Sequence, residues 1–299
     1  MLPTIDGVGP SCIVLPPGPW QTVIDFLSAR FDTIARAEIE SRMASGHILS
    51  ATGESILPNH PYQAHLKLFY YRHIAAETHI PFDEVVLFED EYLVVADKPH
   101  FLPVTPGGRY LQETLLVRLK RKLGIDTLAP MHRIDRETAG LVLFTKQPHT
   151  RGTYQKLFSN REVEKRYQAV ALHRADLKLP MTYRSRLTGT DHFMRMKEVA
   201  GVANAETGIE SIEVRGEGGL ARYRLLPLTG KRHQLRVHMA ALGVPILNDQ
   251  IYPDHFSKAQ IEADDFSRPL QLLAEYIAFC DPVTGQERRF ESRRSLLAL

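Results

Sequence analysis

The run MHRIDRETAGLVLFTK, residues 131–146, joins a group of polar residues to an apolar stretch. The stretch Leu141–Thr145 has the composition of a buried strand, and the turn-prone pair Ala129-Pro130 stands just before the run. We therefore expect His132, Arg133 and Asp135 on a loop at the mouth of a sheet, where functional side chains concentrate. An isolated Arg-x-Asp is also typical of a structural salt bridge, so the run alone leaves both interpretations open.

Similar apolar or alternating runs recur from about residue 82 to the C-terminus. Separated by turns, they are predicted strands: VVLFED, YLVVADKP, RYQAVAL, ARYRLLPL and YIAFCDP. Helical patterns at residues 111–122 and 230–242 lie between some of them and end at Gly124 and Gly243. Because strands and helices do not alternate regularly, the pattern favours a mixed α+β domain over a doubly wound parallel sheet.

The first 84 residues have a different character. An irregular Pro- and Gly-rich arm precedes two predicted helices, at residues 21–30 and 33–46, and a predicted strand at residues 64–71. This order, with AEIESRMASGHI before a glycine turn, resembles the small S4-type RNA-binding domain. Since few basic residues stand on the second helix, a merely structural helical appendage is the alternative. We predict an arm and S4-like or helical appendage at residues 1–84 and a main domain at residues 85–299.

The length and composition of the chain indicate a globular protein. A chain of 299 residues with 43% apolar content can bury a substantial core. No apolar stretch approaches the length of a membrane helix and no signal peptide is evident, so we expect a cytoplasmic protein with no membrane partner. Cys12 and Cys280 lack the spacing of a disulfide framework or a structural zinc site.

Positively charged side chains are clustered in parts of the sequence and are only slightly in excess over the whole chain. The net charge is only +2, so a surface for a polyanion must come from clusters of cations. One such cluster has few acids among its basic residues, which are Arg151, Lys156, Arg161, Lys165, Arg166, Arg174, Lys178, Arg184 and Arg186. A solvated basic face explains any one of these residues, but phosphate contacts explain the cluster better.

Three blocks carry a family resemblance. HRIDRETAGLVLFTK resembles the HRLD…TSGLLL…K signature of the RluA-type pseudouridine synthases. EKRYQAV, residues 164–170, resembles the segment that supplies the family's active-site tyrosine, and residues 228–252 resemble its TGRTHQ(L/I)RVH…G.PI.GD..Y block. The blocks occur in the family's order and the resemblance spans roughly residues 85–299. It implies the pseudouridine synthase fold, with a largely antiparallel sheet and flanking helices.

The resemblance also implies an activity and a catalytic group. Such an isomerase cuts the bond from uracil N1 to ribose, turns the base and rejoins it through C5. Asp135 corresponds to the family's catalytic aspartate, which acts either as a nucleophile or as a base, and Arg236 to the partner that keeps it ionised. Tyr167 corresponds to the tyrosine that stacks on the target base and whose hydroxyl assists removal of the C5 proton. An ordinary strand tyrosine is the alternative for Tyr167.

Other polar residues of these blocks are expected to bind RNA. A base must leave its stack to react, and Arg133 is the candidate to fill the gap. The further RNA-binding candidates are His132, Lys165, Arg166, Arg232 and His233. Arg232, His233 and Arg236 are predicted to share one face of the helix at residues 230–242. His233 and His238 do not have the spacing of a metal site, and we expect neither a metal nor a cofactor.

Departures from the family pattern bear on the substrate. In the block DKPHFLPVTPGGRY, Asp97, Phe101 and Thr105 replace asparagine, glycine and histidine, which indicates a divergent subfamily with its own substrate. Structured RNA is the expected partner, ribosomal RNA before transfer RNA, bound by a monomer. A non-catalytic RNA-binding protein on the same fold is the alternative. A glycosidase would need a second carboxylate, and Glu137 is expected to face solvent.

Overall fold

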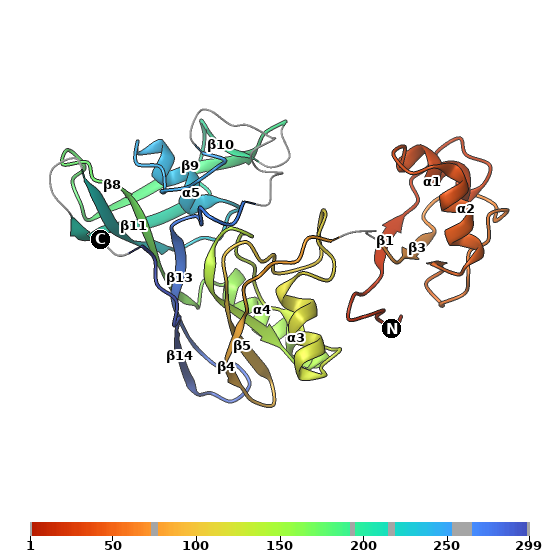
Figure 1. The fold of residues 1–299 in the computed structure, drawn as a ribbon, viewed down its shortest axis with the longest axis horizontal. Coiled ribbons are helices and arrows are strands. Elements are labelled where there is room, and N and C mark those ends of the chain that lie inside the picture. Colours follow the sequence, from red (N-terminus) through yellow and green to blue (C-terminus); the bar gives the residue numbers. More distant parts are fainter. Residues whose placement is uncertain (1, 73–76, 192–194, 215–218, 253–264, 298–299) are drawn as a thin grey trace. The chain divides into compact units, whose positions relative to one another are not determined.

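The computed structural model describes residues 2–72, 77–191, 195–214, 219–252 and 265–297. The chain divides into two compact units (Figure 1). The first comprises residues 1–77 and 108–112, and the second comprises residues 78–107 and 113–299. Among the described residues, no helix combines the length and the apolar character that a membrane crossing requires.

The first unit is a small sheet with two helices. Its antiparallel strands have the order β1-β3-β2, and its elements are β1 (Ser11–Val14), α1 (Val23–Arg30), α2 (Arg36–Ala44), β2 (Ile48–Leu49) and β3 (Lys67–Tyr70). A capping box begins α1, in which the Thr22 side chain accepts from the Asp25 N–H and the Asp25 carboxylate accepts from the Thr22 N–H. Both helices lie within the ranges predicted for them. The likeness to an S4-type domain stays a prediction.

The second unit is built on an 11-stranded mixed sheet. Its long path has the order β10-β9-β11-β12-β8-β13-β7-β5-β4, while β14 pairs with β13 and β6 with β7. The strands before the middle of the chain are β4 (Val85–Glu89), β5 (Leu93–Lys98), β6 (Ala129–Pro130) and β7 (Ala139–Thr145). The later strands are β8 (Glu164–Leu172), β9 (Met181–Gly189), β10 (Met196–Val199), β11 (Ala205–Val214), β12 (Leu220–Pro227), β13 (Leu272–Cys280) and β14 (Glu287–Glu291).

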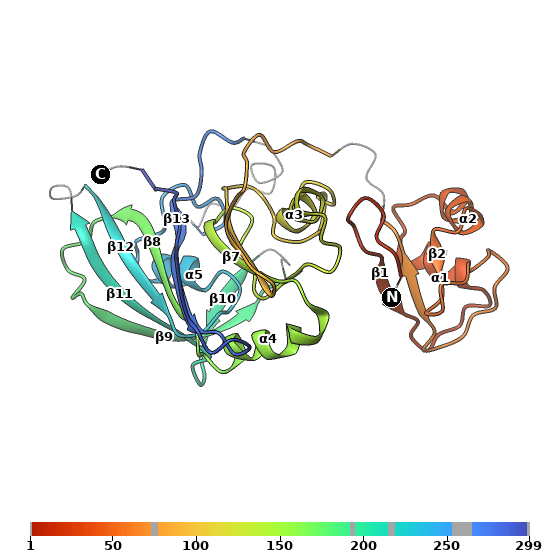
Figure 2. The same cartoon turned by 90° about the horizontal axis from the view of Figure 1, so that it is seen from below.

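β13 joins the two halves of this sheet. It pairs with β7 in parallel and with β8 in the antiparallel sense, so a strand from late in the chain lies between two earlier ones (Figure 2). The other pairs in the sheet are antiparallel. The predicted mixed α+β class with a largely antiparallel sheet is therefore confirmed.

Helices flank the sheet, and a side chain caps the start of α3. They are α3 (Leu115–Leu123), the 3-10 turn η1 (Pro148–Thr150), α4 (Arg151–Ser159) and α5 (Gln234–Ala241). The helix predicted at residues 111–122 begins later, because the Thr114 side chain accepts the Val117 N–H and caps it there. Gly124 ends it as predicted, with a φ of 68°.

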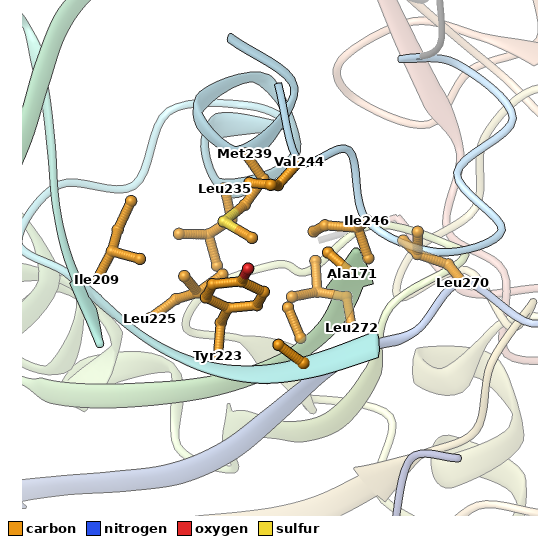
Figure 3. Close-up of a cluster of buried hydrophobic side chains, with 12 residues drawn as sticks. Ala171, Ile209, Tyr223, Leu225, Leu235, Met239, Val244, Ile246, Leu270 and Leu272 are labelled. Atoms are coloured by element: carbon orange, nitrogen blue, oxygen red, sulfur yellow. The ribbon is translucent and has the colours of Figure 1, made fainter. Parts of the chain in front are cut away.

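Two apolar clusters pack α5 and α4 against the sheet. Leu235 and Met239 of α5 pack on Tyr223 and Leu225 of β12 and on Ile209 of β11 (Figure 3). Tyr154 and Leu157 of α4 belong to a second cluster with side chains of β5, β7 and β13. The segments that carry the polar residues of interest are thus anchored on a rigid scaffold.

Candidate active site

A close approach of two backbones places the Asp135 loop. Gly140, at the start of β7, has a φ of 110°, and a Cβ there would collide with the carbonyl of Ala274 on β13. Only glycine permits this approach without strain. Ala274 pairs with Gly140 on one side and with Tyr167 of β8 on the other. The loop before β7 and the Tyr167 side chain therefore reach the same region of the sheet.

A buried arginine links two carboxylates in this region. The Arg236 side chain, 1% exposed, donates from Nε and Nη2 to the two carboxylate oxygens of Asp249, each at 2.7 Å. Its Nη1 donates to Oδ2 of Asp135 at 3.3 Å. Two parallel hydrogen bonds fix the plane of a guanidinium group. The predicted contact between Arg236 and Asp135 is present, and the bond to Asp249 fixes the orientation of the Arg236 guanidinium group.

Asp249 is a site residue that the sequence analysis did not single out. Its side chain is 1% exposed, and the backbone N–H groups of Ile251 and Tyr252 donate to it at 2.8 and 3.2 Å. Burial opposes its charge, but Arg236 and these donors hold the pKa of Asp249 below its ordinary value. The aspartate stands within the third block of family resemblance, so the signal for it was present.

Glu137 does not face solvent, and that expectation is wrong. Its side chain is 23% exposed, with Oε2 3.7 Å from Arg236 Nη1 and Oε1 3.4 Å from Arg136 Nη1. Arg236 therefore faces three carboxylates.

Tyr167 lies beside Asp135 and is partly buried. Both residues line a cavity of about 740 Å³, a volume within the usual range of roughly 300 to 1,000 Å³ for ligand pockets. Burial, and then the charge of Asp135, raise the pKa of the Tyr167 hydroxyl. The hydroxyl therefore keeps its proton at neutral pH, which favours stacking and hydrogen bonding over a phenolate.

Several cations around this cavity are available to a ligand. Arg133, Lys165 and Lys231 line it, and no side-chain hydrogen bond or ion pair within the described part of the chain engages them. Arg133 and Lys231 are exposed. Arg232 also lines the cavity and donates to the Arg195 carbonyl at 3.2 Å. Such side chains are suited to phosphate groups.

Contacts with Leu143 and Phe158 fix the His132 ring, and the ring is neutral. Its Nε2 accepts the Leu143 N–H at 3.2 Å, and its ring stacks on Phe158 at 4.7 Å between centroids. Burial, with a smaller effect of Lys165, lowers the pKa of His132 to about 3. A neutral ring cannot form the ion pair with phosphate that an RNA-binding role of this kind would use.

Arg166 does not reach the cavity. In a strand, successive side chains point to opposite faces, so Arg166 lies on the face of β8 opposite Lys165 and Tyr167. Its guanidinium carbon is 3.7 Å from the centroid of the Tyr276 ring, and its Nη2 is 3.6 Å from Glu291. Its position gives no support to the predicted RNA-binding role.

His233 reaches the site from a turn rather than from a helix face. The predicted helix at residues 230–242 begins only at Gln234. The reason is local, because the Gln234 side chain accepts from the Lys231 N–H and the Thr229 hydroxyl at 3.1 and 2.7 Å and closes a compact turn. His233 ends this turn with a φ of 55°. The prediction that Arg232, His233 and Arg236 share a helix face is therefore wrong.

The end of β5 and the loop after it contact the backbone that follows Asp135. Lys98 is fully buried and donates from Nζ to the carbonyls of Pro99 and Arg136, both at 3.0 Å. Burial is the main reason that the pKa of Lys98 falls to about 7. His100 lies 2.7 Å through Nδ1 from the Glu137 carbonyl. These bonds fix the backbone that follows Asp135.

The three residues that depart from the family pattern, Asp97, Phe101 and Thr105, lie in different surroundings. Asp97 is buried and accepts from the Ser292 hydroxyl and the Arg293 N–H at 2.8 and 2.7 Å, so it anchors the C-terminal segment. Phe101 is 5% exposed, and its carbonyl accepts from Arg136 Nε at 3.0 Å. Thr105 lines the cavity, so it is the departure positioned to affect the substrate.

Comparison with known proteins completes the description of the site. A family model described as RNA pseudouridylate synthase matches residues 92–241, half of the chain. The chain belongs to the RluA-type RNA pseudouridine synthase family. It is thus an RNA-modifying isomerase, and Asp135, Tyr167 and Arg236 all fall within the matched residues.

The relatives agree with this assignment. The synthase is 30% identical over 244 residues to an uncharacterized RNA pseudouridine synthase of Synechocystis sp., covering 77% of this chain and 79% of the relative. It is 29% identical over 216 residues to the dual-specificity RNA pseudouridine synthase RluA of Haemophilus influenzae, covering 70% and 92%. The solved structure of human RNA pseudouridylate synthase domain containing 4 is 26% identical, with a TM-score of 0.53 over 71% of this chain and 88% of that one.

A metal site is not evident in the part of the chain that is described. There, no group of three or more His, Cys, Asp or Glu side chains is arranged to hold a metal ion. His233 and His238 have separate partners, since His238 lies 2.9 Å from the Thr207 hydroxyl and 3.1 Å from the Ser185 hydroxyl. His238 thus ties α5 to β11 and β9.

Proposed function

We propose that this synthase converts specific uridines in structured RNA to pseudouridine, with Asp135 as the catalytic carboxylate. The observation that carries the proposal is the placement of Asp135: one oxygen lies on a buried arginine, and the side chain, 22% exposed, lines a cavity together with Tyr167 and unpaired cations. A carboxylate held in this way is oriented toward a bound nucleotide. Ribosomal RNA is the first target that we propose, and transfer RNA the second.

The position of each side chain gives the role that we propose for it. Asp135 attacks the ribose or removes one of its protons, which frees the base from the sugar. Tyr167 stacks on the flipped base while it turns. The cations Arg133, Lys165 and Lys231 bind phosphates on either side of the reacting nucleotide. Arg236 compensates the charge of Asp135 throughout.

The target is tested with RNA that carries tritium at uridine C5. Purified full-length protein is incubated separately with ribosomal and transfer RNA from cells that lack it, and label released to water is counted. Release from ribosomal RNA alone is the expected result. The name of the Haemophilus influenzae relative includes the words dual-specificity, so the transfer RNA arm is essential, and pseudouridine maps of cells with and without the protein identify the position. Release from neither RNA would contradict the proposal.

Tyr167→Phe is expected to separate binding from turnover. The phenylalanine ring retains stacking, so the Kd for substrate RNA should change by less than about threefold, because only a partly buried hydroxyl is lost. Turnover should fall by roughly 10²-fold or more, as on losing a group that moves protons. Single-turnover tritium release and filter binding measure the two quantities. A turnover equal to that of the unaltered protein would show that the hydroxyl has no role.

Arg133→Ala is expected to affect folded RNA more than flexible RNA. An exposed arginine beside Asp135 can fill the gap that a flipped base leaves, and a flexible RNA has less stacking to replace. We expect kcat/KM to fall at least about tenfold on a stem-loop, and by about threefold on an unstructured RNA of the same sequence around the target uridine. Lys231→Ala, another exposed cation of the same cavity, is the matched control and should lower both values similarly. Equal losses for Arg133→Ala on the two RNAs would contradict this role.

A further inference from the structure

The two carboxylate oxygens of Asp135 face different partners. Oδ2 accepts from Arg236 Nη1 at 3.3 Å, whereas Oδ1 lies 3.8 Å from Nε2 of His233. The His233 side chain is 11% exposed, and its φ of 55° lies in the left-handed region. This backbone conformation is uncommon for a residue other than glycine. Here the conformation of His233 places its imidazole ring beside Asp135.

Tyr252 is the hydrogen-bond partner of the other ring nitrogen of His233. The backbone N–H of Met196 donates to the Tyr252 hydroxyl at 3.0 Å, so this oxygen is already an acceptor. Nδ1 of His233 lies 2.8 Å from this oxygen, a distance at which the hydroxyl can donate its single proton to an unprotonated Nδ1. An imidazole that accepts at Nδ1 carries its proton on Nε2 when it is neutral. In this arrangement Nε2–H faces Oδ1 of Asp135.

The surroundings keep both rings neutral. Burial has the largest effect on His233 and lowers its pKa from the ordinary value, with help from Arg236 and Arg232 and against the effect of Asp135 and Glu137. Burial also raises the pKa of Tyr252. The Tyr252 hydroxyl thus has a proton to give, and Nδ1 of His233 has a lone pair to receive it.

We propose that His233 is a positioning residue for Asp135, fixed by Tyr252 in the Nε2–H form so that it donates to Oδ1 when a nucleotide occupies the cavity. Arg236 then holds one carboxylate oxygen and His233 the other. Two donors on two oxygens fix the plane of the carboxylate, which one donor does not. The inference rests on the proposed function, because it assumes that Asp135 acts on the nucleotide.

The form of the ring is measured first, by ¹⁵N NMR of the labelled full-length protein at neutral pH. His233→Ala assigns the signals of His233 among the 13 histidines by their disappearance. In the unaltered protein we expect a protonated Nε2 and an unprotonated Nδ1. In Tyr252→Phe the two shifts should move toward each other as the two neutral forms exchange. A protonated Nδ1 in the unaltered protein would overturn the proposal, whether or not the protein acts on any RNA tested.

Turnover is measured second. His233→Ala should lower kcat by about ten- to hundredfold, the rate equivalent of losing one hydrogen bond to a charged group, with little change in KM. His233→Gln, whose amide N–H can replace Nε2–H, should restore most of the loss. Tyr252→Phe should lower kcat by less than His233→Ala does, and its control Tyr183→Phe, which removes a hydroxyl bonded to Glu198 at 3.1 Å, should leave kcat unchanged. Equal kcat values for His233→Ala and His233→Gln would contradict the positioning role.

Discussion

Asp135→Asn is expected to reduce tritium release from uridine C5 by about 10⁴-fold or more, as losses of a catalytic nucleophile or base do. Asparagine has the shape of aspartate and can still accept from Arg236 Nη1, but it carries no charge with which to attack the ribose or take a proton. Stability should change by less than about 1 kcal/mol, because the side chain is partly exposed and Asp249 still pairs with Arg236. Single-turnover assays and urea unfolding measure the two effects.

The control for this substitution is Asp32→Asn. Asp32 is an exposed carboxylate in the first unit, so its loss should leave both turnover and the urea midpoint unchanged. RNA affinity is measured for both variants, since a defect in binding would imitate a defect in chemistry. An Asp135→Asn protein that binds RNA and still releases tritium within tenfold of the unaltered rate would remove Asp135 from the chemistry.

Arg236→Met is expected to cost about 3 to 5 kcal/mol of the free energy of unfolding, the range found when one partner of a buried ion pair is removed. It leaves Asp249 buried without its guanidinium partner, and among the described residues two backbone N–H groups remain to compensate its charge. Turnover should be lost as well, since Asp135 loses the donor on Oδ2. Urea unfolding at pH 7 measures the stability.

A second variant separates the loss of stability from the loss of turnover. In Arg236→Met/Asp249→Asn neither member of the buried pair carries a charge, and the asparagine oxygen can still accept from Ile251 and Tyr252, so most of the stability should return. Turnover should not return. Arg184→Met is the control, because its pair with Glu206 is exposed and should contribute less than about 1 kcal/mol. A double variant as unstable as Arg236→Met would show that packing, rather than the unpaired carboxylate, causes the loss.

The residues that sequence analysis located share one property. Asp135, Tyr167 and Arg236 each lie in a contiguous block whose local pattern resembles a family motif, so no knowledge of the fold was needed to single them out. The sheet class was also accessible, because strands are read from apolar runs. Asp249 lies in the third block as well, but only the structure shows its role, which is the bidentate bond to Arg236.

The errors have local physical causes. Arg166 was grouped with Lys165 and Tyr167 by proximity in sequence, although the two-residue period of a strand already places it on the other face. The start of α5 depended on the bonds of the Gln234 side chain to residues 229 and 231, which helical spacing does not reveal. Glu137 was assigned to solvent because its neighbour Arg236 stands about a hundred residues later in the chain.

The late position of β13 in the chain has a consequence for synthesis on the ribosome. Leu272–Cys280 lies between β7, which follows Asp135, and β8, which carries Tyr167. A nascent chain that ends before this segment has made every strand of the long path except the one that joins its halves. Because long-range pairing is slow and domains fold as units, we expect the enzyme to acquire activity only after Leu272–Cys280 has been made, which protects RNA from modification by shorter chains.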